Sequence, residues 1–125
     1  MCSIMGYRGK NSAAPILVNG LQRMEYRGYD SVGVATKSKN QILLRKGIGK
    51  VVEVNNAVQL DKLPGNVGIG HTRWATHGKV TEKNAHPHPS NSGKIAIVHN
   101  GIIENFEELK LNLQKKGFDF HSETD

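Results

Sequence analysis

Apolar residues recur along the first 72 residues with the spacings of alternating strands and helices. Ala13, Leu17 and Leu21 share one face at helical spacing, and Asn11 or Ser12 can cap this helix at its start. Shorter apolar stretches, bounded by glycine, proline or polar turns, are typical of strands. The predicted strands cover residues 3–7, 31–36, 41–46 and 66–72, and a weaker predicted helix covers residues 51–60.

The remaining residues begin with a long polar segment and contain the clearest helix. Residues 74–93 are rich in His, Pro, Ser and Asn and predict a loop, whereas residues 94–100 form the strongest strand pattern in the chain. The helix predicted at 105–116 has glutamates in its first turn and lysines in its last, and Gly117 is suited to a left-handed cap. Another strand is expected at 118–121. Because helices alternate with strands that also follow one another, we expect an α+β fold.

The composition is that of a globular domain and argues against two classes of partner. The 125 residues are 37% hydrophobic, enough for one domain with a core. The 17 basic and 11 acidic residues give a net charge of +6, but no five like charges are consecutive, so we expect no nucleic-acid partner. No apolar run approaches the ~18 residues of a membrane span, and the first residues lack a secretory signal pattern. We therefore expect a cytoplasmic protein with no membrane partner.

The cysteine and histidine content limits the metal chemistry. Cys2 is the only cysteine, so the chain can form neither an intrachain disulfide nor a multi-cysteine zinc site. By pattern alone, Cys2 is more often a small buried residue at the head of a strand. Five of the six histidines lie between positions 71 and 99, but no His-Glu-x-x-His helix accompanies them. We therefore expect no metal and no other cofactor.

Three further sites carry groups that suit a charged small molecule. Arg73, followed by Trp74, can grip a carboxylate through its planar fork, although a surface arginine stacked on the tryptophan fits the pattern equally well. Asn100 and Gly101 form an ordinary turn signal, yet a side-chain amide and a backbone N–H can also face an oxyanion. Asp125 can bind an ammonium group, but this signal is weak on its own.

Four segments in order carry a more specific signal. They are residues 25–31 (EYRGYDS), 71–78 (HTRWATHG), 84–88 (NAHPH) and 99–105 (HNGIIEN). Together they resemble the N-terminal glutaminase domain of the glutamine–fructose-6-phosphate aminotransferases, which are class II glutamine amidotransferases of the N-terminal-nucleophile hydrolase type. The resemblance spans residues 2–125. Sister enzymes such as amidophosphoribosyltransferase and asparagine synthetase share the cysteine and the Asn-Gly pair but match the first two segments less well. A non-catalytic basic binding module is the alternative from another class.

The resemblance implies a role for each candidate residue. Met1 is expected to be removed, so that Cys2 becomes the nucleophile and its own α-amine, with a pKa of about 7.7–8.0, takes the thiol proton. Asn100 and Gly101 are expected to form the oxyanion hole. The expected glutamine-binding residues are Arg73, Trp74, Thr76, His77 and Asp125, with Arg27 in a supporting position near the nucleophile.

The resemblance also implies a fold and a reaction. The fold is an αββα four-layer sandwich, of which residues 1–125 are expected to be the N-terminal part, without the rest of the domain and without the sugar isomerase domains. The full-length enzyme is expected to be a homodimer that hydrolyses L-glutamine and delivers ammonia to fructose 6-phosphate, making glucosamine 6-phosphate. Because fructose 6-phosphate would bind the isomerase domain, we expect the 125-residue chain alone not to make that product. Ser3 stands where the family usually has glycine.

Overall fold

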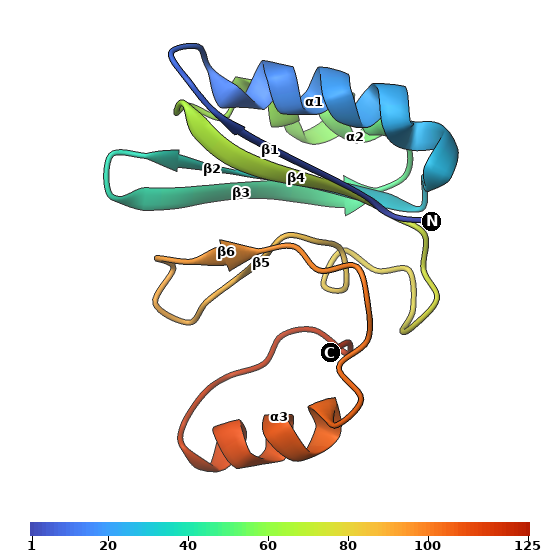
Figure 1. Cartoon of the computed structure of the whole chain (residues 1–125), viewed down its shortest axis with the longest axis vertical. Helices are drawn as coiled ribbons and strands as arrows, with labels where there is room; N and C mark the ends of the chain where they lie inside the picture. The colour runs from blue at the N-terminus through green and yellow to red at the C-terminus, as the bar shows by residue number, and fades with distance from the viewer.

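A four-stranded antiparallel sheet organises the N-terminal half of the chain (Figure 1). The structure is a computed structural model that describes all residues from 1 to 125. The sheet order is β1-β4-β2-β3, so the last of these strands along the chain lies between the first two. The strands confirm the four predicted from the sequence, and they are β1 (Ser3–Arg8), β2 (Ser31–Ser38), β3 (Gln41–Ile48) and β4 (Val67–Arg73).

Two helices cover one face of this sheet (Figure 1). They are α1 (Ala13–Met24) and α2 (Val51–Val58), each followed by a short 3-10 turn, η1 (Glu25–Arg27) after α1 and η2 (Leu60–Lys62) after α2. The predicted apolar face of α1 is confirmed, because Leu17 and Leu21 are fully buried against Val32 and Val34 of β2. None of the helices is both long and apolar enough to cross a membrane.

Glycines on β4 bring α1 close to the sheet and fix which face is which. A Cβ on Gly68 or Gly70 would stand 2.8 Å from the side chain of Leu17 or Leu21, respectively. Because side chains alternate along a strand, His71 and Arg73 point to the other face, away from the helices. We call the face that carries His71 and Arg73 the polar face of the sheet.

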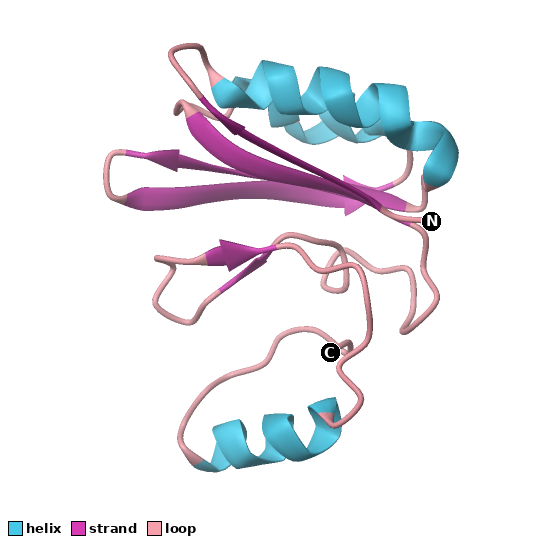
Figure 2. Cartoon of the chain, in the orientation of Figure 1, coloured by secondary structure: helices cyan, strands magenta, loops and turns pink.

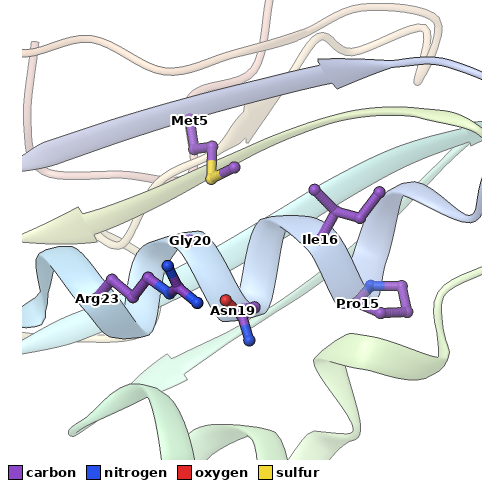
Figure 3. Close-up of a pocket in the computed structure, with 6 residues that line it drawn as sticks. All are labelled: Met5, Pro15, Ile16, Asn19, Gly20 and Arg23. Carbon is purple, nitrogen blue, oxygen red and sulfur yellow. The ribbon is translucent and has the colours of Figure 1, made fainter.

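A shallow hollow of about 490 Å³ lies on the helix side, at the edge of the sheet beside β1 (Figure 3). Met5 fills the space above Gly20, where an added Cβ would stand 1.9 Å from its sulfur. The hollow is lined by Met5, Pro15, Ile16, Asn19, Gly20 and Arg23. It opens on the opposite side of the sheet from His71 and Arg73.

The C-terminal half is mostly loop and extends from the other face of the sheet (Figure 2). A two-stranded ribbon, β5 (His88–Pro89) paired with β6 (Ala96–Ile97), follows the sheet, and α3 (Phe106–Lys115) lies beyond the ribbon (Figure 1). No residue of α3 is buried. A cavity of about 1540 Å³ separates β3 and the ribbon from the C-terminal segment. The observed elements therefore make an α+β fold.

Three predictions about the elements need correction. The strand expected at 94–100 is wrong for most of its length, because its backbone finds a ladder partner only at β5, inside the segment predicted to be all loop. No strand forms at 118–121. Ser12 stands at the N-cap of α1 without a side-chain capping bond, and the Ala13 N–H instead donates to the Gly65 carbonyl at 2.9 Å. The helices expected at 51–60 and 105–116 and the left-handed Gly117, with φ +89°, are confirmed.

Candidate functional site

Cys2 stands immediately before β1, on the polar face of the sheet. Ser3 points to the helix side, where its Oγ donates to the Met24 carbonyl at 3.5 Å, so the preceding side chain points the other way. The Trp74 N–H donates to Cys2 Sγ at 3.2 Å. Since β1 and β4 are antiparallel neighbours with Ser3 opposite Thr72, Cys2 lies beside Arg73. The thiol is half-buried, and it contacts the first residue after β4.

The segment 26–28 wraps around the N-terminus. The Met1 ammonium donates to the Arg27 carbonyl at 2.5 Å, and Arg27 Nη2 lies 3.9 Å from the Met1 sulfur. Gly28 packs so closely that a Cβ there would stand 2.8 Å from the Met1 carbonyl and 3.1 Å from the Trp74 nitrogen. The sequence reasoning assigned no role to Gly28. Glycine is required at position 28 because the backbones of Met1 and of residues 73–74 leave no room for a Cβ.

Arg73 is 5% exposed and holds the loop that follows β4. Its Nη1 donates to the Lys79 carbonyl at 3.0 Å, and its Nη2 donates to the His77 carbonyl. The guanidinium has five N–H donors in a fixed fork, so these two bonds leave donors for a further acceptor. The alternative of a surface arginine stacked on Trp74 is wrong, because Arg73 is buried and Trp74 packs edge-to-face on Tyr29 at 5.7 Å.

Asp30 fixes the beginning of the same loop. Its carboxylate accepts the Ala75 N–H and, at 3.3 Å, the Ser31 hydroxyl, while its own N–H donates to the Arg73 carbonyl at 3.1 Å. Trp74 remains 47% exposed and Thr76 is exposed as well. His77 packs its ring against Phe106, with centroids 5.3 Å apart. The loop is thus held from both sides while Trp74 and Thr76 stay accessible.

Asn100 is brought to the polar face of the sheet by His71. His71 Nε2 lies 2.6 Å from Asn100 Oδ1, and His71 is two residues before Arg73 on β4, on the same face. Gly101 follows, and a Cβ there would stand 2.9 Å from the His99 imidazole. No hydrogen bond joins Cys2 to Asn100 or Gly101. Cys2 and Asn100 therefore face the same side of the sheet without a hydrogen bond between them.

Asp125 is tied to the loop around Arg73 through Asn84, a residue to which the sequence reasoning gave no role. The Asp125 carboxylate accepts the Ile103 N–H at 2.7 Å and lies 3.6 Å from His99 Nδ1. Asn84 is fully buried, donates to the Lys79 carbonyl at 3.0 Å and accepts the Glu123 N–H at 2.9 Å. The Lys79 carbonyl is the one that Arg73 also binds. The only signal for this role was the position of Asn84 at the start of the segment 84–88.

Three neutral histidine rings pack against one another where β4 meets the ribbon strand β5. His86 stacks on His71 with centroids 4.4 Å apart and meets His88 at 4.5 Å. Burial lowers the pKa of all three rings. At His86 and His88 neighbouring histidines and cations lower the pKa further, to about 3 and about 4, respectively. Burial also lowers the pKa of Lys46, which donates to the Ala85 and Pro87 carbonyls at 2.6 and 3.3 Å. No three His, Cys, Asp or Glu side chains are grouped closely enough to hold a metal ion.

The polar face thus carries a half-buried thiol, a buried guanidinium with spare donors and the side-chain amide bound by His71. The Asp125 carboxylate lies on the C-terminal segment, beside His99 and the Ile103 N–H. A thiol beside hydrogen-bond donors suits nucleophilic attack on a carbonyl, because donors can hold the oxygen that becomes negative. A positive guanidinium and a negative carboxylate at separate positions suit a small molecule that carries both a carboxylate and an ammonium group. Such a set is compatible with acyl transfer through the cysteine.

Sequence comparisons agree on one kind of protein. The family described as glutamine amidotransferase domain matches residues 55–125. The chain is 55% identical over 125 residues to glutamine–fructose-6-phosphate aminotransferase [isomerizing] of Pyrococcus horikoshii, covering 100% of this chain and 21% of that protein. It is 58% identical over 126 residues to the protein of the same name from Bacteroides thetaiotaomicron, covering 20% of it. The chain therefore spans about a fifth of the length of these relatives.

Solved structures with the same fold belong to related proteins. Glutamine phosphoribosylpyrophosphate amidotransferase from B. subtilis matches with a TM-score of 0.82 and 30% identity, over 100% of this chain and 27% of its own. A second structure, described as the allosteric regulatory enzyme of purine biosynthesis, matches with a TM-score of 0.83 and 30% identity, over 98% of this chain and 27% of its own. The α+β arrangement seen here is thus shared with an amidotransferase.

Proposed function

This chain belongs to the glutamine amidotransferase domain family, and we propose that it carries the glutamine-hydrolysing site of a class II amidotransferase with Cys2 as nucleophile. The observation that carries the proposal is the contact between Cys2 Sγ and the Trp74 N–H, one residue from the buried Arg73. It joins the N-terminal thiol to the segment that would bind the substrate.

Removal of Met1 would make the catalytic pair. With Met1 attached, the Cys2 nitrogen is a peptide nitrogen and cannot accept a proton. Once freed, it becomes an α-amine with a pKa of about 7.7–8.0, placed on the same residue as the thiol. The amine then takes the thiol proton, and the sulfur attacks as a thiolate.

The reaction proceeds in two stages, formation of a thioester on Cys2 and hydrolysis of that thioester. A C–S bond forms between Cys2 and the side-chain amide carbon of glutamine, and the carbonyl electron pair moves onto oxygen, where Asn100 Nδ2 and the Gly101 N–H donate to it. The C–N bond then breaks as the α-ammonium returns its proton to the leaving nitrogen, which departs as ammonia. Water, deprotonated by the same amine, hydrolyses the γ-glutamyl thioester to glutamate and free Cys2.

Two charged groups would select free glutamine over a peptide amide. Arg73 would bind the α-carboxylate with the donors not used by His77 and Lys79, and Asp125 would bind the α-ammonium. The link through Asn84 supports this pairing, because it ties the Asp125 segment to the loop that Arg73 holds. Trp74, Thr76 and His77 would line the site between them, and Arg27 would support the N-terminus.

The wider reaction follows from the relatives. We infer that residues 1–125 are the N-terminal part of a four-layer αββα glutaminase domain within a longer, homodimeric enzyme that passes ammonia to fructose 6-phosphate and forms glucosamine 6-phosphate. The 55% identity to a glutamine–fructose-6-phosphate aminotransferase supports this acceptor over that of the phosphoribosylpyrophosphate amidotransferase, to which the identity is 30%.

The proposal is tested by an intact mass spectrum after exposure to an electrophilic analogue of glutamine. We expect an adduct on the Met1-free chain that excess glutamine prevents and that Cys2→Ala abolishes. Iodoacetamide serves as the control, since it reports an accessible thiol without a substrate site. A Met1-free chain that iodoacetamide labels but the analogue does not would contradict a formed glutamine site.

A further inference from the structure

A short hydrogen bond joins β4 to the segment that carries Asn100. His71 Nε2 lies 2.6 Å from Asn100 Oδ1, and the imidazole is 1% exposed. Because an amide oxygen only accepts, Nε2 carries the hydrogen and the lone pair of the neutral ring is on Nδ1. The bond fixes the amide flip, since Oδ1 faces the imidazole and the two Nδ2 hydrogens face away from it.

The surroundings of His71 hold its ring in this tautomer. Nδ1 is buried without a hydrogen-bond partner, so a hydrogen on Nδ1 would be an unpaired buried donor. The ring plane is fixed by stacking on His86 at 4.4 Å. Burial lowers the pKa of His71, and the charge of Arg73, two residues along β4, lowers it further, whereas the hydrogen bond to Asn100 and the Asp30 carboxylate raise it without reversing the shift.

A second contact fixes the backbone next to Asn100. The His99 N–H donates to His86 Nδ1 at 3.3 Å. His86 thus holds the main chain one residue before Asn100, while His71 holds the Asn100 side chain. The position and the flip of the amide are therefore set by two stacked rings.

The amide that is fixed in this way lies over the nucleophile's end of the sheet. His71 is opposite Ile4 in the antiparallel register, and Ile4 is two residues after Cys2 on the same face of β1. We propose that His71 is a positioning residue that orients the Asn100 amide so that Nδ2 donates to the oxyanion formed at Cys2. The inference rests on the proposed function, and it adds a residue that never touches the substrate.

The test compares two replacements of His71 that differ in one hydrogen-bond donor. His71→Gln keeps an N–H near the position of Nε2, whereas His71→Met fills similar space without a donor. We expect His71→Met to slow labelling of Cys2 by the electrophilic glutamine analogue about 3- to 10-fold at saturating analogue, and His71→Gln to restore most of the rate. Labelling by iodoacetamide should not change. His88→Gln is the matched control, since it removes a half-buried ring of the same cluster that makes no hydrogen bond to Asn100.

A double-mutant cycle separates positioning from general loosening. Asn100→Ala should slow labelling by about 10²–10³-fold, and adding His71→Met to it should cost nothing more. Full additivity of the two effects, or equal rates for His71→Met and the wild type, would overturn the proposal. Unequal iodoacetamide rates would show a changed thiol and would overturn it as well.

Nitrogen-15 NMR of His71 decides the inference independently of activity. We expect Nε2 to be protonated and Nδ1 bare, and the Asn100 side-chain amide signals to shift in His71→Met but not in His88→Gln. A proton on Nδ1, or unshifted Asn100 signals, contradicts the proposal. If the wild-type chain shows the expected signals but takes no glutamine analogue, the proposed function fails while the hydrogen bond stands.

Discussion

The two halves of the molecule are held together by different forces. All eleven residues of the apolar core lie between positions 13 and 63, on the helix-covered face of the sheet and on the elements that pack there. From position 74 onward, the only buried apolar side chains are those of Ala85 and Pro87, and α3 buries none of its residues. Yet Asn100, Gly101 and Asp125 lie in this second half. The scaffold is thus fixed by burial, whereas the candidate site is fixed by directional polar bonds.

Several polar bonds of the second half start from the first. Asp30, His71 and Arg73 each reach across from the scaffold to a backbone or side-chain group after position 74. A net hydrogen bond contributes only about 0.5–1.5 kcal/mol, but it fixes an angle, which apolar contact does not. The orientation of the candidate site residues therefore depends on directional polar bonds and on few buried side chains.

The same leucine deletion in each half gives the largest expected contrast. Leu21→Ala removes a fully buried side chain, whereas Leu111→Ala removes one that is 59% exposed on α3. We expect the first to lower the free energy of unfolding by about 2–5 kcal/mol through lost transfer energy and a residual cavity. The second should change it by less than about 0.5 kcal/mol. Urea unfolding followed by circular dichroism measures both, and equal effects would break the comparison.

Asn84→Leu is expected to loosen the second half without unfolding the first. It leaves the Glu123 N–H without a partner and removes one of two donors from the Lys79 carbonyl, at a local cost of about 1–3 kcal/mol. Limited trypsin digestion should cut after residue 79 about 10-fold faster, while residues 3–73 stay intact. Asn91→Leu is the control, because Asn91 makes two bonds to Asp119 but is exposed. Equal acceleration by both variants would show that burial of Asn84 is irrelevant.

The same division explains what the sequence could predict. Local periodicity was sufficient for α1 and the four strands, because Leu17, Leu21 and the apolar runs encode burial within a few residues. The prediction of a strand at 94–100 is wrong for most of its length, because the length of this strand depends on its partner β5. No local sequence pattern specifies that partner. The β1–β4 and β2–β4 pairings, the close packing of Gly28 on Met1 and the bond between Asn84 and Glu123 join positions 27 to 69 residues apart. The site residues were therefore predicted from a family resemblance, because spacing alone left Arg73 and Asn100 open to ordinary structural readings.

Lowering the pH should weaken the attachment of the second half of the chain to the sheet. We expect this change in stability to be the smallest of those predicted here. His86 and His88 have pKa values of about 3 and 4 in the folded chain, because burial and then nearby histidines and cations, Arg73 and Lys46 among them, disfavour their protonated forms. Asp125 opposes this shift at His88. Unfolded histidine titrates near 6.5, so below that pH the unfolded chain binds more protons and stability falls as the pH falls. Above about pH 6.5 this contribution is fully present.

Because both rings are partly solvated, we expect a combined loss of about 1 kcal/mol between pH 6.5 and 5.5, below the limit of about 1.4 kcal/mol per group and pH unit. His88→Gln should flatten the slope of unfolding free energy against pH in this window, whereas His121→Gln, on an exposed ring, should leave it unchanged. Protonated His86 can no longer accept the His99 N–H at Nδ1, so trypsin should reach the second half before the sheet loses its circular dichroism. Simultaneous loss of both signals would mean that the two halves unfold as one unit, and the division between burial and polar bonds would then describe contacts but not stability.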